Sequence, residues 1–255
     1  HLSVKIDGIL GFPLFRHNLL TLDYPQSRIV LAPSDSVANV PGTPIPYTTK
    51  HRTPIIPVQI GEYTVSVLID SGSDAAFNLR PDLRDIPYTQ PPRPIAFVGT
   101  LTGNHTLQVT RLTQSLSFAG QTFPTPIVHI TDELTSIGGE ILKHFSLTFD
   151  QVRSQVSFQR DSRKPIMQSS LRDTGLHFRK TPAYWRVVNS VPDSPASAAG
   201  LRLGDLVSRL NGESVEHWDI ASYDQLLAES SEIIYTLLQG TEESSITLPV
   251  SELVP

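Results

Sequence analysis

The 255-residue chain contains no cysteine, and its net charge is weak. The absence of cysteine excludes disulfide bonds, thiolate metal sites and cysteine nucleophiles. Lysine and arginine number 20 against 25 acidic residues, for a formal charge of −5, and no basic cluster stands out. Nucleic acid is therefore not expected as a partner. The longest apolar runs, such as 64–69, are strand-sized and far shorter than the ~18 residues of a membrane-spanning helix.

Several patterns that carry chemistry are also missing. The eight histidines show no His-Glu-x-x-His or other ligand spacing, so no metal site is expected. Neither a Gly-x-Ser-x-Gly elbow nor a phosphate-binding glycine loop occurs, and no cofactor is predicted. The chain begins at His1 without an initiator methionine or a signal-peptide pattern. We therefore expect that a native N-terminus was removed or left out, and the compartment stays open.

The residues that are present suit a globular protein of two domains, with 39% hydrophobic and 18% charged residues. From Val58 to Phe158 a period-two alternation predicts strands. Prolines crowd 33–57 and predict an extended linker or an edge-wrapping strand. A charged stretch at 160–165 ends in proline, and helix signals then appear among the strands, so we place a domain boundary there.

Three short helices are predicted from local signals. The first spans 139–144. The second lies within 194–200, with serine as N-cap, proline at the first helical position and glycine at its end. The third spans 222–229 and precedes a strand at 233–238.

An internal repeat links the N-terminal residues to the end of the β-rich segment. A shift of 127 residues places 11–31 on 138–158 with matched polarity. Two unrelated amphipathic hairpins are the alternative, but the agreement of turn positions favours duplication. The identical pairs are Gly11/Gly138, His17/His144, Leu20/Leu147, Thr21/Thr148, Asp23/Asp150 and Ser27/Ser154.

The candidate catalytic residue is Asp70, in the tripeptide Asp70-Ser71-Gly72. It follows an apolar strand at 63–69, so the carboxylate emerges at a strand end where a glycine lets the backbone turn sharply. Further along, Ile137-Gly138 precedes the first predicted helix. This order resembles the aspartic proteases of the pepsin and retropepsin class. In each lobe of those enzymes, a strand and Asp-Thr/Ser-Gly are followed by a flap hairpin, an apolar-apolar-Gly segment and a helix.

The resemblance implies an endopeptidase in which two aspartates activate a water molecule. Asp70 would be one of them, Ser71 would contact the other lobe, and Gly72 would allow the close approach of two loops. The flap would span 97–112, with Gly99 and Gly103 as flexible points on the substrate. The sequence departs from the family at Ser73-Asp74 and at Ser136, where small or apolar residues are usual.

One carboxylate cannot be both acid and base, so the resemblance requires a second one. An N-terminal lobe ahead of residue 1 or the Asp70 of a second copy could supply it. The repeat favours the lobe, because residues 1–32 would otherwise be an orphan tail with unpaired strands. This chain alone is therefore expected to be inactive as a monomer.

Residues 166–255 resemble a PDZ domain. The resemblance rests on Thr174-Gly175-Leu176-His177-Phe178, Ala199-Gly200-Leu201, Leu203-Gly204-Asp205 and Asn211-Gly212, in that order. It implies that Gly175, Leu176, His177 and Phe178 bind a peptide, with backbone amides around its C-terminal carboxylate and the peptide added as a strand. His177 departs from the family, which has glycine there, and this leaves open a structural or autoinhibitory module.

Together these features predict a mainly β protein: a retropepsin-like β-barrel lobe, preceded by the tail of another lobe and followed by an α+β PDZ domain. The predicted function is an aspartic endopeptidase acting on polypeptide, and the rival is an inactive scaffold that binds peptides through its PDZ groove. The resemblance favours an extracytoplasmic location. The predicted divisions are 1–32 for the first lobe's tail, 33–52 for the linker, 53–160 for the protease lobe and 166–255 for the PDZ domain.

Overall fold

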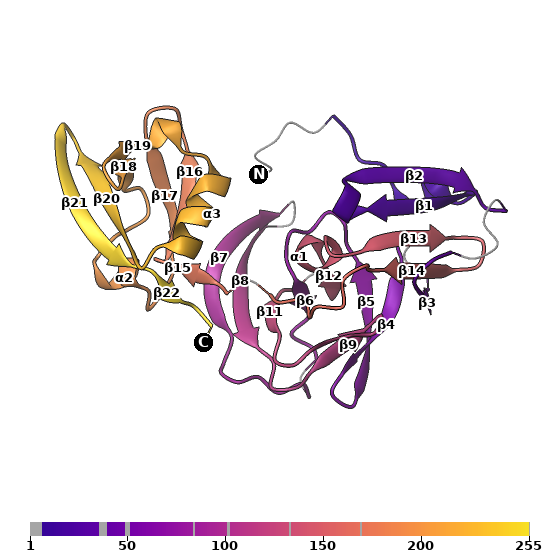
Figure 1. Ribbon diagram of the computed structural model, residues 1–255. Coiled ribbons are helices and arrows are strands. Elements are labelled where there is room, and N and C mark those ends of the chain that lie inside the picture. Colours follow the sequence, from indigo (N-terminus) through magenta and orange to yellow (C-terminus); the bar gives the residue numbers. More distant parts are fainter. Residues whose placement is uncertain are drawn as a thin grey trace. The chain divides into compact units, whose positions relative to one another are not determined.

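A computed structural model describes residues 7–35, 40–48, 52–83, 85–100, 103–132, 134–168 and 170–254, with backbone only at 96–100 and 103–106. The chain divides into two compact units. Unit 1 comprises 1–89 and 111–168, and unit 2 comprises 90–110 and 169–255. Strands dominate both units (Figure 1). Among the described residues, every helix is too short or too polar to cross a membrane.

Unit 1 contains two sheets. One has the order β2-β1-β13-β14-β3, and in the other the neighbouring strands run β10-β9-β4-β5-β12-β6-β11. The alternating apolar residues of β4 and β5 are buried in a shared core, as the period-two pattern predicts. The elements are η1 (Phe12–Phe15), β1 (Asn18–Asp23), η2 (Tyr24–Gln26), β2 (Arg28–Pro33), β3 (Thr43–Pro46), β4 (Ile55–Ile60), β5 (Tyr63–Ile69), β6 (Phe77–Leu79), β9 (Leu116–Phe118), β10 (Gln121–Phe123), β11 (Ile127–Ile130), β12 (Ser136–Ile137), α1 (Gly139–Leu142), β13 (Ser146–Asp150) and β14 (Gln155–Gln159).

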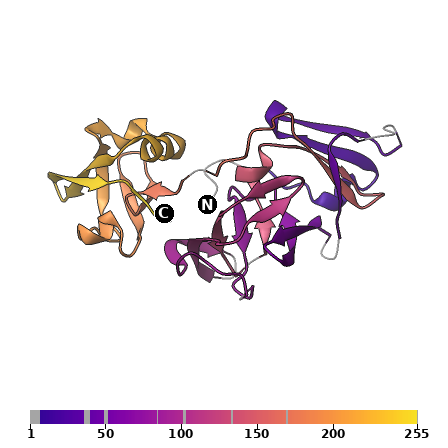
Figure 2. The same ribbon diagram turned by 60° about the horizontal axis from the view of Figure 1, so that its bottom comes forward.

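The internal repeat appears as a two-fold pattern in the five-stranded sheet. β1 and β13 are antiparallel, and Thr21 lies opposite Thr148, its equivalent in the repeat. Their hydroxyls are 2.9 Å apart. Ser27 and Ser154, also equivalent, both adopt the left-handed conformation, with φ of 51° and 53°. The indigo hairpin β1–β2 lies beside β13 and β14 in both views (Figures 1 and 2). Of the two alternatives for the proline-rich stretch, residues 43–46 form an edge strand, β3, paired with β14.

Unit 2 is built on the sheet β16-β17-β18-β20-β21, with β19 paired to β18. Trp185 and Tyr235 are its largest fully buried side chains. The second predicted helix is confirmed as α2, where the Ser194 side chain accepts a hydrogen bond from the Ser197 amide. The elements are β7 (Arg93–Thr100), β8 (Gly103–Arg111, whose last residue belongs to unit 1), β15 (Arg172–Asp173), β16 (Leu176–Lys180), β17 (Trp185–Ser190), α2 (Pro195–Ala198), β18 (Leu206–Leu210), β19 (Glu213–Ser214), η3 (Val215–His217), α3 (Ile220–Glu229), β20 (Glu232–Gln239), β21 (Glu242–Pro249) and β22 (Ser251–Glu252).

Candidate functional site

Asp70 stands at the end of β5, where sequence analysis placed it. Its amide donates to the carbonyl of Ile137 at 2.9 Å, which joins the strand end to β12. The following loop packs tightly on Gly138: a Cβ there would lie 2.4 Å from the Ala75 carbonyl oxygen. Burial raises the pKa of Tyr24, and the Asp70 carboxylate raises it further, so these two side chains share an environment. The close approach of the Ala75 carbonyl to Gly138 explains why a glycine follows Ile137.

The Asp70 carboxylate is engaged within its own turn. Its Oδ1 accepts a hydrogen bond from the Gly72 amide at 2.9 Å, which is an Asx turn. The tripeptide Asp173-Thr174-Gly175 of unit 2 makes the same turn, with the Gly175 amide 2.8 Å from Asp173 Oδ1. Two loops in different units thus use Asp-Ser/Thr-Gly to form one local structure. The tripeptide therefore encodes a turn, whatever chemistry surrounds it.

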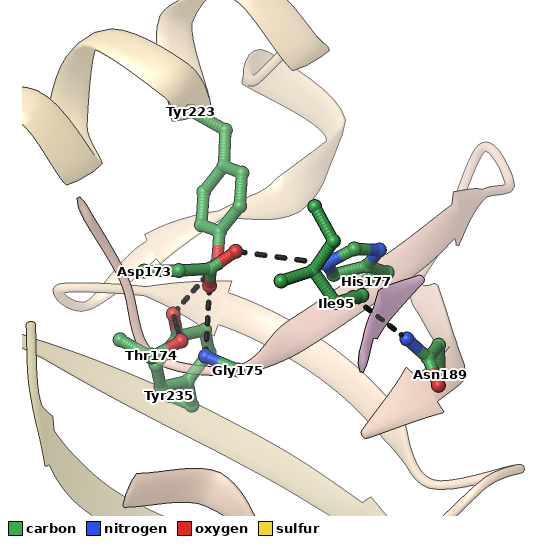
Figure 3. Close-up of polar contacts among 8 residues, drawn as sticks. All are labelled: Ile95, Asp173, Thr174, Gly175, His177, Asn189, Tyr223 and Tyr235. Carbon is green, nitrogen blue, oxygen red and sulfur yellow. Dashed lines mark hydrogen bonds and ion pairs between the residues drawn. The ribbon is translucent and has the colours of Figure 1, made fainter. Parts of the chain in front are cut away.

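The segment predicted as a flap forms the hairpin of β7 and β8. Gly99 lies opposite Asn104, and Gly103 lies opposite Thr100, so both glycines are within the ladder. Residues 101–102 lie outside the described residues. Residues 90–110 belong to unit 2, where the Ile95 carbonyl accepts a hydrogen bond from the buried Asn189 side chain at 3.1 Å (Figure 3). Arg93 also donates to the Leu253 carbonyl at 3.2 Å.

In unit 2 the predicted peptide-binding residues lie at one edge of the sheet. Gly175 precedes β16, and Leu176, His177 and Phe178 are its first three residues. β16 is the terminal strand, and among the described residues no strand pairs with its outer side. Helix α3 packs beside β16, because the rings of Phe178 on β16 and Tyr223 on α3 meet edge-to-face with centroids 5.6 Å apart. We call this strand side, together with the facing residues of α3, the β16 edge.

A buried polar network fixes the loop in front of β16. The Thr174 and Tyr235 hydroxyls are 2.8 Å apart, and the Tyr235 and Tyr223 hydroxyls are also 2.8 Å apart (Figure 3). Thr174 is fully buried, and its carbonyl accepts the Ala196 amide at 2.9 Å. Burial raises the pKa of both tyrosines far above the neutral range, so both phenols are protonated at neutral pH. The loop is consequently rigid and its buried hydroxyls are paired.

Asp173 brings a negative charge to the start of the β16 edge. Its carboxylate bonds the Gly175 amide through Oδ1 and lies 3.6 Å from His177 Nε2 through Oδ2. The preceding Arg172 donates to the Ala228 and Ser230 carbonyls at the end of α3, at 2.6 and 2.8 Å. Sequence analysis missed Asp173, Tyr223 and Tyr235. The three residues are far apart in sequence and carry no shared local pattern, although the Asp-Thr-Gly tripeptide was a usable signal.

The comparisons identify a PDZ domain in unit 2, where the PDZ domain family matches residues 186–239. Three solved structures are similar to this chain. A peptide-bound PDZ domain of a carboxy-terminal protease from Vibrio cholerae is 21% identical, with 33% of this chain and 97% of that chain covered and a TM-score of 0.29. The HtrA-type protease AlgW with a decapeptide is 12% identical, with 89% and 85% covered and a TM-score of 0.32. The EIAV protease with an inhibitor is 20% identical, with 38% and 90% covered and a TM-score of 0.32.

These findings correct the prediction of an aspartic endopeptidase. The HtrA-type protease AlgW covers 89% of this chain, whereas the EIAV protease covers 38%. Within the described ranges no hydrogen bond joins Asp70 to a second carboxylate, and one carboxylate cannot be both acid and base. The dyad role of Asp70 is therefore not proposed, and neither are the supporting roles of Ser71 and Gly72 or the completion of a dyad by another lobe or copy.

Proposed function

We propose that this chain binds extended polypeptide segments at the β16 edge of its PDZ domain. The observation that carries the proposal is that β16 is an edge strand beside α3, with no strand on its outer side among the described residues. An extended peptide can join such a side through main-chain hydrogen bonds, while its side chains meet the neighbouring helix. AlgW and the Vibrio cholerae PDZ domain were both solved with peptides, which supports this class of ligand.

The position of α3 beside β16 is set at both ends by hydrogen bonds. At one end, Lys180 Nζ donates to the Trp218 carbonyl just ahead of the helix. At the other, Arg172 donates to the carbonyls that end it. The Lys180 contact joins α3 to β16 and the Arg172 contact joins it to β15, so strand and helix are already positioned for a peptide. A preformed site loses little conformational entropy when a peptide is ordered on it.

An apolar floor supports the same ligand. Phe178 is half-buried and packs on Trp185 and Tyr223, with centroid distances of 5.5 and 5.6 Å. Leu226 on α3 is partly buried against the same core. Apolar side chains of a peptide would cover these residues and add hydrophobic free energy to the main-chain hydrogen bonds. Gly175, Leu176, His177 and Phe178 are the proposed docking residues.

For unit 1 we propose a retropepsin-like fold, with no activity attached to it. Its support is the placement of β12 between β5 and β6, parallel to the first and antiparallel to the second. The short helix α1 follows at once, in the order that the resemblance implies. An experimental structure of the full chain tests this, and a different strand order around β12 would refute it.

The peptide-binding proposal is tested with the full chain and a pool of ten-residue peptides. Peptides enriched on the immobilised protein are measured by fluorescence polarisation against wild type and Leu226→Glu. We expect saturable binding to wild type and at least about a tenfold loss in the variant, because a charge would enter the apolar floor. Leu203→Glu is the matched control, since Leu203 is 68% exposed and outside the β16 edge. Equal affinity of wild type and Leu226→Glu, or no saturable binding at all, would refute the proposal.

A further inference from the structure

We infer that the β16 edge selects an internal peptide segment, with lysine or arginine where the peptide meets Asp173, and rejects a free C-terminal carboxylate there. This rests on the proposed peptide binding at β16. It reverses the expectation that the loop at 175–178 receives a peptide C-terminus. The reason is the charge that the structure places beside that loop.

Strand direction brings the end of the peptide to Asp173. The neighbouring strands of this sheet pair antiparallel, as β16 does with β17. A peptide added antiparallel to β16 runs with its C-terminal part toward Leu176, the first residue of the strand. The preceding turn holds Asp173 at that point through the Gly175 amide. A terminal carboxylate would therefore approach a second carboxylate.

The Asp173 charge is not cancelled by a fixed cation. His177 Nε2 lies 3.6 Å away and is charged only when protonated. Arg172 is the next cation along the chain, but its two terminal nitrogens are directed to carbonyls at the end of α3, and among the described contacts it forms no ion pair with Asp173. Tyr223 and Tyr235 remain neutral hydroxyls. An incoming lysine or arginine would supply the missing positive charge, whereas a carboxylate would add to the negative one.

The turn also prevents Asp173 from leaving. The Asp173 side chain is 16% exposed and is held by the Gly175 amide. The next residue, Thr174, is fixed by Tyr235 and by the Ala196 amide. Avoiding a peptide carboxylate would require breaking this turn. Charge at the other end has the opposite sign, because Arg179 and Lys180 end β16, so the preferred segment is acidic early and basic late.

The test uses the full chain and one enriched peptide in three forms: free acid, C-terminal amide, and an amide extended by one lysine. Fluorescence polarisation gives the affinity of each form for wild type, Asp173→Asn and Glu242→Gln. In Asp173→Asn the side-chain amide oxygen would still accept from the Gly175 amide, while the negative charge would be lost. Glu242 lies on β21 and provides the control for a general change of charge.

For wild type we expect the lysine-extended form to bind about tenfold or more tightly than the free acid, with the amide between them. In Asp173→Asn this difference should shrink to about twofold, while Glu242→Gln should retain it. A free acid that binds wild type as tightly as the lysine form would overturn the inference and leave peptide binding intact. An unchanged preference in Asp173→Asn would also overturn it. If no form binds, the proposed function fails as well.

Discussion

Gly175→Ala should strongly destabilise unit 2, and Gly200→Ala provides a matched comparison. Both glycines have positive φ, 91° at Gly175 and 81° at Gly200, so both substitutions place alanine in the left-handed region. That conformation costs about 1–2 kcal/mol for a residue with a Cβ. The two sites differ in their surroundings. A Cβ at Gly175 would lie 2.0 Å from Ser194 Oγ, whereas at Gly200 nothing lies within 4 Å.

The added cost at Gly175 follows from what Ser194 does. Its side chain caps α2 by accepting the Ser197 amide, so moving it loses a cap of about 1 kcal/mol. Forcing an extra carbon into a packed site costs about 1–3 kcal/mol more. The φ contribution is common to both variants and cancels in the comparison. Gly175→Ala should therefore lower the free energy of unfolding by about 2–4 kcal/mol more than Gly200→Ala.

Urea unfolding followed by tryptophan fluorescence measures this difference. The chain has two tryptophans, Trp185 and Trp218, and both belong to unit 2. The signal thus reports on that unit without contribution from unit 1. A difference below about 1 kcal/mol between the unfolding free energies of the two variants would refute the reasoning, because it would mean that the Ser194 side chain can move away without loss of stability.

Three further predictions concern buried or partly buried polar groups. Tyr235→Phe should cost about 1–3 kcal/mol in urea unfolding, and more than Tyr223→Phe, since only Tyr235 bonds two hydroxyls. Thr21→Val should destabilise unit 1 by about 1 kcal/mol, because it leaves the Thr148 hydroxyl without its partner. Adding Thr148→Val should recover part of that loss by removing this hydroxyl. Circular dichroism in urea measures the stability of both variants, and additive losses would contradict the prediction. Burial lowers the pKa of His129 below 6.5, so the contribution of the neutral side chain to stability should be complete above pH 6.5 and decline as the pH falls through that value. In His129→Gln the free energy of unfolding should decline less over the same pH range. Equal slopes of unfolding free energy against pH in wild type and variant would contradict the prediction.

Local signals predicted much of the architecture. The cap, proline and glycine of α2 are short-range features, and the helix lies where they place it. The repeat predicted two equivalent hairpins, and the structure pairs them through Thr21 and Thr148. These predictions hold because turn conformation and capping depend on neighbouring residues. The pairing of one repeat with the other is long-range, and the sequence pattern alone did not place it.

The aspartic-protease function was predicted from the order of elements around Asp70, and that order does not establish the chemistry of the carboxylate. Asp70-Ser71-Gly72 and Asp173-Thr174-Gly175 form the same turn through one carboxylate–amide hydrogen bond. The aspartate in both tripeptides is therefore accounted for by the local turn that its carboxylate closes. Whether such a carboxylate is catalytic depends on a second group brought near it by tertiary structure, which no tripeptide specifies.

The peptide site was predicted in outline only. Gly175 and the apolar residues at the start of β16 follow from the PDZ resemblance, which carries no information on the charge of Asp173. Its surroundings are set by residues such as Tyr235, 61 positions after Thr174, and by Arg172 at the end of α3. Contacts at that sequence separation depend on packing, so their effect on specificity becomes visible only in the folded chain.

Backbone NMR of the isotope-labelled full chain during titration with an enriched peptide tests peptide binding at the β16 edge most directly. The account predicts saturable shift changes concentrated at Leu176–Lys180 and along Ile220–Glu229. Amides of β21, on the opposite side of the sheet order, should change little. Saturable changes centred on β21 or on unit 1, with β16 unaffected, would contradict the account.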